Sequence, residues 1–133
     1  MVLEYKRKIF GYECDIYGHL NNANYLHLYE EARAGALEQM GLAVRELNQS
    51  SFHIYLTSIE LTFKKGIPLE ETVTIKSSIN EMNRVSTLWE QKIYNSKNEL
   101  CNTAIVKGVF VKNGKPVRLP KEIYTQFNKF KKK

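Results

Sequence analysis

One long stretch of the chain has helical periodicity, and strand-like stretches follow it. Apolar or small side chains recur at the i, i+3, i+4 and i+7 spacing of one helix face from Tyr25 to Met40. Asn21 and Asn22 are good N-cap residues just before this stretch, and Gly41 is a common helix end just after it. We therefore expect one amphipathic helix of about four to five turns that starts near Asn22.

Four later stretches have the composition of β-strands. Apolar and polar residues alternate over residues 58–64 and again over residues 72–80, as in half-buried strands. Residues 84–95 and 100–112 are rich in β-branched and aromatic types, and the polar turn between them predicts a hairpin. Residues 4–12 are a further, irregular candidate strand. The pattern predicts an α+β layout in which an antiparallel sheet of about five strands covers the helix.

The rest of the chain adds a turn and a short helix but no domain boundary. Asn113-Gly114 is typical of a type I′ turn, and Pro120 can open a C-terminal helix that carries Phe127 and Phe130 on one side. No segment is rich in Pro, Gly or Ser, and no internal repeat is present. We interpret residues 1–133 as a single domain.

Hydropathy indicates where in the cell the protein is located, and cysteine spacing indicates whether it binds a metal or a redox cofactor. No stretch approaches the roughly 18 apolar residues of a membrane-spanning helix, and the N-terminus lacks the apolar region of a signal peptide. We expect a cytoplasmic protein without stable membrane insertion. Cys14 and Cys101 lack the spacing of a redox or metal motif, and His27 and His53 complete no metal set with them. We expect neither a metal nor a cofactor.

Net charge favours an anionic partner without naming it. Twenty Lys and Arg against fourteen Asp and Glu give a formal charge of +6, part of which lies in the C-terminal run of lysines. Phosphorylated small molecules and nucleic acid both fit this sign. The chain has no helix-turn-helix or RNA-recognition motif, so we expect no nucleic-acid partner.

The most specific pattern in the chain runs from Glu13 to Arg33. It has an acidic residue, a glycine three positions later, a His-Leu-Asn-Asn run, a tyrosine ten positions after the acid, and then Glu-Glu-Ala-Arg. This segment resembles the signature of the 4-hydroxybenzoyl-CoA thioesterase family of hot-dog proteins. The matching residues are Asp15, Gly18, His19, Asn21, Asn22, Tyr25, Glu30, Ala32 and Arg33. The resemblance covers nearly the whole chain and implies a hot-dog fold that hydrolyses an acyl-CoA thioester to a free acid and coenzyme A.

The resemblance also implies catalytic roles. Asp15 is expected to act as a nucleophile that forms a mixed anhydride, or as a general base that activates water. The backbone N–H of Asn22, at a helix start where such groups lack intrahelical partners, is expected to stabilise the oxyanion. His19 is expected to orient Asp15, to contact substrate, or only to stabilise the loop.

Three further residues are candidates for substrate binding. Tyr25 belongs to the motif, although a tyrosine at this helix position is also typical of a core. Lys65 and Arg84 stand near predicted strand ends, where they can bind coenzyme A phosphates or be ordinary surface charges. Arg84 is favoured by its place in an Arg-Val-Ser segment. The resemblance further implies a homodimer or a dimer-based tetramer with active sites between subunits.

Other interpretations remain open from the sequence. Asp15 can be a capping residue without catalytic function. A hot-dog hydratase or dehydratase acts on acyl thioesters with a His and Asp pair arranged around a β-carbon. A non-catalytic hot-dog protein can bind acyl-CoA as a regulator. The continuous match from Asp15 to Arg33 favours hydrolysis.

Overall fold

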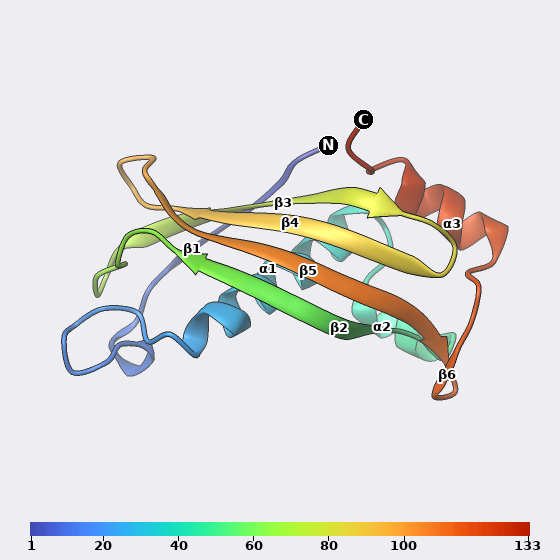
Figure 1. Ribbon diagram of the computed structural model, residues 1–133, viewed down its shortest axis with the longest axis horizontal. Helices are drawn as coiled ribbons and strands as arrows, with labels where there is room; N and C mark the ends of the chain where they lie inside the picture. Colours follow the sequence, from blue (N-terminus) through green and yellow to red (C-terminus); the bar gives the residue numbers. More distant parts are fainter.

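The computed structural model describes residues 1–133 and contains one long helix, α1, that lies against an antiparallel sheet (Figure 1). The strands are β1 (Leu3–Lys8), β2 (Phe52–Phe63), β3 (Thr72–Met82), β4 (Ser86–Tyr94), β5 (Leu100–Lys112) and the two-residue β6 (Lys115–Pro116). The helices are η1 (Gly11–Glu13), α1 (Asn24–Gln39), α2 (Val44–Gln49) and α3 (Lys121–Asn128). This is the predicted α+β layout, and the expected hairpin between β4 and β5 is present.

The strand order is β1-β3-β4-β5-β2, with β6 beside the end of β5. Every pairing is antiparallel. β5 pairs with β2 from Phe52 to Phe63, and no other strand lies on the far side of β2. β2 is therefore a long edge strand whose outer backbone groups have no partner in the sheet.

One face of the sheet is buried under α1. On β4, Thr87, Trp89, Gln91 and Ile93 are buried and alternate with half-buried residues, which is the pattern of a strand covered on one side. α1 contributes to the same core through the residues of its apolar face, namely Tyr25, Leu28, Tyr29, Ala32, Ala36 and Leu37. Truncation of a side chain as buried as Leu28 to alanine typically costs about 2–5 kcal/mol.

α1 starts close to the predicted position near Asn22, but neither Asn21 nor Asn22 caps it. The helix begins at Asn24, with Ala23 in the cap position and no side-chain cap bond. The Asn21 side-chain oxygen accepts the N–H of Ala23, and the Asn21 carbonyl accepts the N–H of Asn24, both at 2.9 Å. Asn21 closes a turn before the helix instead of capping it, because asparagine bonds easily to backbone two residues ahead.

The sequence did not predict α2 or the first half of β2. α2 is only six residues long, too short for a helical period to be recognised. β2 begins at Phe52, six residues before the predicted strand at residue 58, and its residues 55–58 are exposed on both faces. Alternation fails there because neither face is covered. No helix in the structure is long and apolar enough to cross a membrane.

Candidate active site

The loop between η1 and α1 folds back on itself at Asp15. The Asp15 N–H donates to the His19 carbonyl at 2.9 Å, and the Gly18 N–H donates to the Asp15 carbonyl at 3.1 Å. Cys14 and Leu20 face each other as bridge partners. Gly18 has a φ of +76°, which a glycine adopts without strain. The predicted catalytic acid therefore stands at the first position of a tight reversal just before α1.

Hydrogen bonds fix only one oxygen of the Asp15 carboxylate. Oδ1 accepts the N–H of Tyr17 at 2.9 Å and, less closely, that of His19 at 3.4 Å. Oδ2 has no hydrogen-bond donor within the protein, and the side chain is half-buried. The carboxylate is thus oriented through one oxygen and offers the other to a substrate or water.

A free backbone donor lies just before α1. The N–H of Asn21 donates to the Glu13 carbonyl at 2.9 Å, and those of Ala23 and Asn24 are bonded to Asn21. The N–H of Asn22 between them has no acceptor in the protein. Such a donor can stabilise a developing negative charge, because it has no acceptor within the protein. The positive end of the α1 dipole, which follows it, also favours negative charge. This is the group that the sequence predicted as the oxyanion donor.

A buried ion pair ties this loop to β1. Arg7 contacts Glu13 through both terminal nitrogens, at 2.7 and 2.9 Å, and the Phe10 N–H donates to the same carboxylate at 3.0 Å. Burial alone would raise the pKa of Glu13, but the hydrogen bonds from Arg7 and Phe10 hold it below its usual value. Glu13 lies two residues before Asp15, so this ion pair helps to place the loop. This ion pair was not predicted, because Arg7 and Glu13 follow no recognised spacing in the sequence.

His19 contacts Asp15 through its backbone and not through its imidazole. Its ring packs against Gly66 in the loop after β2, so closely that a Cβ on Gly66 would lie 3.3 Å from Nδ1. No hydrogen bond joins the ring to Asp15. Of the predicted roles for His19, stabilising the loop is the one that these contacts support.

The three predicted substrate-binding residues lie in different places. Tyr25 is buried in the first turn of α1 with its ring edge toward Phe63, 5.0 Å between centroids, and burial raises its pKa to about 12. Lys65 lies beside the Asp15 loop and forms an exposed ion pair with Glu99. Arg84 lies in the β3–β4 turn at the opposite end of the sheet (Figure 1), where its Nε donates to the Leu119 carbonyl at 2.8 Å. One subunit therefore does not bring Lys65 and Arg84 together.

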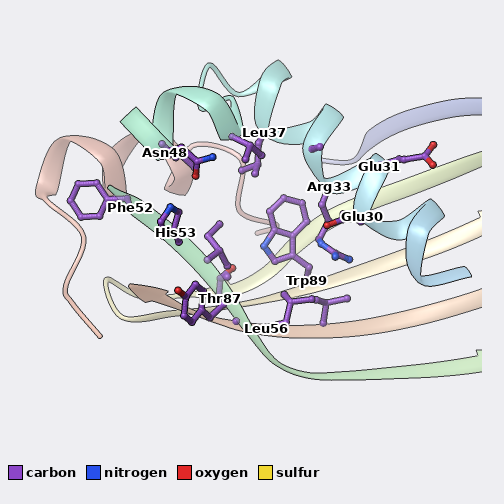
Figure 2. Close-up of a pocket in the computed structure, with 17 residues that line it drawn as sticks. Glu30, Glu31, Arg33, Leu37, Asn48, Phe52, His53, Leu56, Thr87 and Trp89 are labelled. Atoms are coloured by element: carbon purple, nitrogen blue, oxygen red, sulfur yellow. The ribbon is translucent and has the colours of Figure 1, made fainter. Parts of the chain in front are cut away.

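A largely apolar pocket of about 630 Å³ lies between α1, α2 and the inner face of the sheet (Figure 2). Its apolar walls include Leu37, Leu47, Phe52, Ile54, Trp89 and Val106. Its wall also carries the polar side chains of Glu30, Glu31, Arg33, Asn48, His53 and Thr87. The sequence did not reveal this pocket because its walls come from five separate elements. No group of three His, Cys, Asp or Glu side chains is arranged to hold a metal ion.

Arg33 projects into this pocket from the middle of α1 without a carboxylate partner. Its Nη1 donates to the Gln91 side-chain oxygen at 2.9 Å, and none of the ion pairs in the structure includes it. Burial lowers the pKa of Arg33, and Glu30 one turn away partly offsets that shift. Gln91 is held in turn by the Tyr29 carbonyl and the Ser77 hydroxyl, at 3.1 and 2.9 Å.

Comparison with known proteins places the chain among thioesterases. Residues 11–127 match the family model described as the Thioesterase-like superfamily. The chain is 30% identical over 86 residues to the long-chain acyl-CoA thioesterase FadM of Escherichia coli (strain K12), which covers 65% of this chain and 64% of FadM. It is 26% identical over 122 residues to the acyl-CoA thioester hydrolase YbgC of Escherichia coli O6:H1, covering 90% of this chain and 91% of YbgC.

A solved structure supports the same fold. The Staphylococcus aureus protein SAV2348, solved in complex with CoA, superposes with a TM-score of 0.90 at 14% identity, covering 100% of this chain and 87% of that one. At this identity the likeness concerns the fold alone. The hot-dog fold expected from the sequence is confirmed.

Proposed function

Because the chain belongs to the thioesterase-like superfamily, we propose that it hydrolyses an acyl-CoA thioester to a free acid and coenzyme A, with Asp15 as the catalytic carboxylate. Thioesterase activity is the activity of its named relatives. The observation that carries the role of Asp15 is the state of its carboxylate: Oδ1 is held by backbone N–H groups and Oδ2 is free. The proposal includes the cytoplasmic location that the sequence predicts.

The free oxygen supports either of two reaction routes. As a nucleophile, Oδ2 of Asp15 attacks the thioester carbonyl carbon, the C–S bond breaks, coenzyme A leaves as its thiolate, and water then cleaves the mixed anhydride. As a general base, the same oxygen takes a proton from a water that attacks the carbonyl carbon directly. In both routes the carbonyl oxygen becomes negative, and the free N–H of Asn22 is our candidate donor to it.

A single-turnover reaction in H₂¹⁸O tests the nucleophile route. If Asp15 is the nucleophile and water attacks the aspartyl carbon of the anhydride, one ¹⁸O atom enters its carboxylate, and mass spectrometry of the peptide containing Asp15 detects it. Label only in the free acid fits a general base, and it also fits an anhydride that water opens at the acyl carbon. Thiol release from a panel of acyl-CoA substrates tests the activity itself, and binding without hydrolysis of any of them would favour the regulatory alternative.

The contacts of His19 disfavour a hydratase or dehydratase. That chemistry needs a His and Asp pair in which both side chains face the same β-carbon. Here the His19 imidazole packs on Gly66 and forms no hydrogen bond with Asp15. Hydrolysis needs only the carboxylate, a water and an oxyanion donor.

The exposed edge of β2 supports a homodimer, alone or within a dimer-based tetramer. An unpaired edge of twelve residues favours pairing with another strand. Tyr55, Leu56 and Phe63 on this strand are about half exposed, at 52%, 48% and 52%. Burial of such side chains against a second copy would remove apolar surface from water. We propose that two β2 strands pair antiparallel about a twofold axis.

This pairing would assemble each site from two subunits. The loop after β2 contacts the Asp15 loop, with the Leu20 N–H on the Ile67 carbonyl at 2.7 Å and the Leu69 N–H on the Gly18 carbonyl at 2.9 Å. The apolar pocket instead uses the other end of β2, from Phe52 to Leu56. Antiparallel pairing brings opposite ends of the two β2 strands together. Asp15 of one subunit would then lie near the pocket of the other.

The same arrangement explains how two distant basic residues can bind one coenzyme A. Lys65 lies at the Asp15 end of the subunit, and Arg84 lies level with the start of β2. In the proposed dimer, Lys65 of one subunit and Arg84 of the other approach the same site. Replacing either by glutamate should raise KM for acyl-CoA more than it lowers kcat, and raised salt should do the same.

A further inference from the structure

The positive charge of the protein is concentrated in residues 107–133. This segment contains nine Lys and Arg and one acid, Glu122, so its formal charge is +8. Residues 1–106 contain eleven Lys and Arg against thirteen Asp and Glu, a formal charge of −2. We call the nine basic residues of the segment the basic end; they are Lys107, Lys112, Lys115, Arg118, Lys121, Lys129, Lys131, Lys132 and Lys133.

The fold gathers these residues at one end of the sheet. Figure 1 shows β6 and α3 at the same end as the β3–β4 turn. The Lys132 N–H donates to the Ile79 carbonyl at 2.7 Å, which ties the C-terminal tail to β3. Lys107 and Lys131, far apart in the chain, line the same small cleft of about 360 Å³ together with Glu81. The C-terminal lysines therefore belong to the surface of the folded domain.

The charges of the basic end are solvated and lack ion-pair partners. Eight of its nine residues are exposed, and the ninth, Lys131, is half-buried. The five ion pairs of the structure all lie elsewhere. Only two carboxylate side chains, Glu81 and Glu122, lie on or beside this surface. A surface with such an excess of one sign attracts polyanions.

The composition of the basic end favours a diffuse polyanion over an acidic protein. Eight of its nine residues are lysine, and no large apolar side chain in residues 107–133 is exposed. The centre of a protein–protein interface is depleted in lysine and depends on aromatic or apolar anchors. Single-stranded nucleic acid needs exposed aromatic rings on which its bases stack. Phe127 of α3 cannot serve in either way, because it is buried against Phe110.

The basic end also borders the apolar pocket. Lys112 Nζ lies 4.9 Å from the ring centroid of Phe52, and Phe52 lines that pocket. A bilayer with anionic lipids offers negative headgroups and hydrocarbon chains at one surface, whereas a nucleic-acid duplex offers only the negative charge. A polycationic surface beside a pocket for hydrocarbon therefore fits the bilayer better.

We propose that the basic end docks the protein reversibly on membranes that contain anionic phospholipids. The lysines contact the headgroups, and no side chain of the basic end enters the hydrocarbon, because no large apolar side chain in residues 107–133 is exposed. This docking does not depend on the proposed hydrolysis. It would hold the pocket near a bilayer, into which long acyl chains partition.

Binding to lipid vesicles tests the docking. Wild-type protein is floated with vesicles of phosphatidylcholine alone and with vesicles that also contain phosphatidylserine, at low and at high salt. The basic-end variant combines Lys115→Gln, Arg118→Gln and Lys121→Gln. All three residues are exposed and none forms an ion pair, so the fold should be unchanged by their replacement.

A matched control removes the same charge from another part of the surface. It combines Lys6→Gln, Lys8→Gln and Lys97→Gln, three exposed lysines that also form no ion pair. The two variants have the same net charge, so a difference between them reports where the charge lies. Circular dichroism and the melting temperature check that both remain folded.

We expect the wild type to bind vesicles that contain phosphatidylserine, to ignore phosphatidylcholine alone, and to be released by high salt. Each Lys or Arg near an anionic bilayer strengthens binding about fivefold, so the basic-end variant should bind on the order of 10²-fold more weakly. The control should stay within about threefold of the wild-type affinity, because charges beyond a Debye length from the bilayer are screened.

Several results would overturn the docking. The wild type could remain unbound to phosphatidylserine vesicles at low salt, or the two variants could lose affinity equally. Release of most of the protein from the vesicles by duplex DNA or by coenzyme A, at equal phosphate concentration and ionic strength, would assign the basic end to that molecule and not to the bilayer. None of these measurements uses thiol release, so a failure of the proposed thioesterase function would leave them unaffected.

Discussion

Arg7 and Glu13 form a two-point ion pair, at 2.7 and 2.9 Å, that joins β1 to the loop of the candidate catalytic acid. Both side chains are largely withdrawn from water, with exposed fractions of 13% and 5%. Glu31 also contacts Arg7, at 3.3 Å from its Nε, so Glu13 is the more closely bound of two carboxylates on this guanidinium. The stability of the fold and the position of Asp15 therefore depend on the same contact.

The first prediction concerns Glu13→Gln. The variant should lower the free energy of unfolding at pH 7 by about 1.5–3 kcal/mol, because it removes the charge-assisted hydrogen bonds to Glu13 and leaves Arg7 with only Glu31, at 3.3 Å from its Nε. Since the pKa of Glu13 is lowered in the folded protein, its stabilising contribution is present above the unfolded value and is lost as pH falls through the lowered folded value. The difference in free energy of unfolding between variant and wild type, measured with urea, should thus decrease below about pH 4.

A matched control for this variant is Glu4→Gln. Glu4 is about half exposed and lies 3.8 Å from Lys76, so its loss should change stability by less than about 0.5 kcal/mol. Glu13→Gln should also lower kcat while Glu4→Gln leaves it unchanged. Equal effects of the two variants on stability and on kcat would show that the Arg7–Glu13 pair does not position the loop.

The second prediction concerns Asp15→Asn. Asparagine keeps an oxygen that can accept the N–H of Tyr17, so the loop should retain its turn and the melting temperature should change little. It lacks the negative charge needed by a nucleophile or a base, so kcat should fall on the order of 10²-fold or more. Steady-state thiol release and thermal unfolding measure the two quantities.

The contrast with Asp15→Ala distinguishes catalysis from capping. Alanine removes the carboxylate and the turn acceptor together, so it should lose activity and also some stability. If Asp15→Asn stays folded with nearly normal kcat on the best substrate, the catalytic assignment is wrong. If Asp15→Asn unfolds the protein, the result supports the interpretation of Asp15 as a capping residue without catalytic function.

The main elements of this fold could be predicted because their patterns are local. The helix face from Tyr25 to Met40 and the alternation in β3 come from side chains at fixed spacing in the chain. The cap of α1 was wrongly predicted because Asn21 uses its oxygen in a turn, which has the same sequence signal as a cap.

In the candidate site, too, the residues that lie close together in the chain could be predicted and those that come from separate elements could not. Asp15 and Asn22 lie in one short segment, so a sequence motif could identify them together. The pocket around Trp89 joins residues from α1, α2, β2, β4 and β5, and no local pattern indicates which of them meet.

The third prediction concerns the edge of β2. Ser58 is exposed near the middle of this strand and faces Lys107 of β5. Ser58→Asp should be tolerated within one subunit, because the new carboxylate lies opposite a lysine. Across a twofold axis it would meet its own copy, and like charges at such a position disfavour pairing.

Sedimentation velocity measures this effect. Ser58→Asp should shift the protein toward monomer while circular dichroism shows a folded domain, and activity should fall with the dimer fraction. Ser58→Asn is the neutral control of similar shape. A Ser58→Asp protein that keeps the wild-type sedimentation coefficient would place the subunit contact elsewhere, and an active monomer would exclude a shared site.

The fourth prediction is complementation between two inactive variants. Asp15→Asn removes the catalytic carboxylate, and Ala34→Trp fills the pocket from an exposed position on α1. In a shared site, a mixed dimer has one site with both defects and one with neither. Random mixing of the two variants should therefore restore about a quarter of the wild-type activity, since about half of the dimers are mixed and each has one intact site.

The same mixture also tests the alternative, in which each site lies within one subunit. If Asp15 acts with the pocket of its own subunit, every subunit in a mixed dimer has one defect, and the mixture stays as inactive as its components. The two variants are unfolded and refolded together so that subunits exchange, and mixing without refolding gives the baseline. Each variant refolded alone controls for recovery. Restored thiol release only after joint refolding would establish that Asp15 and the Trp89 pocket meet across the subunit contact.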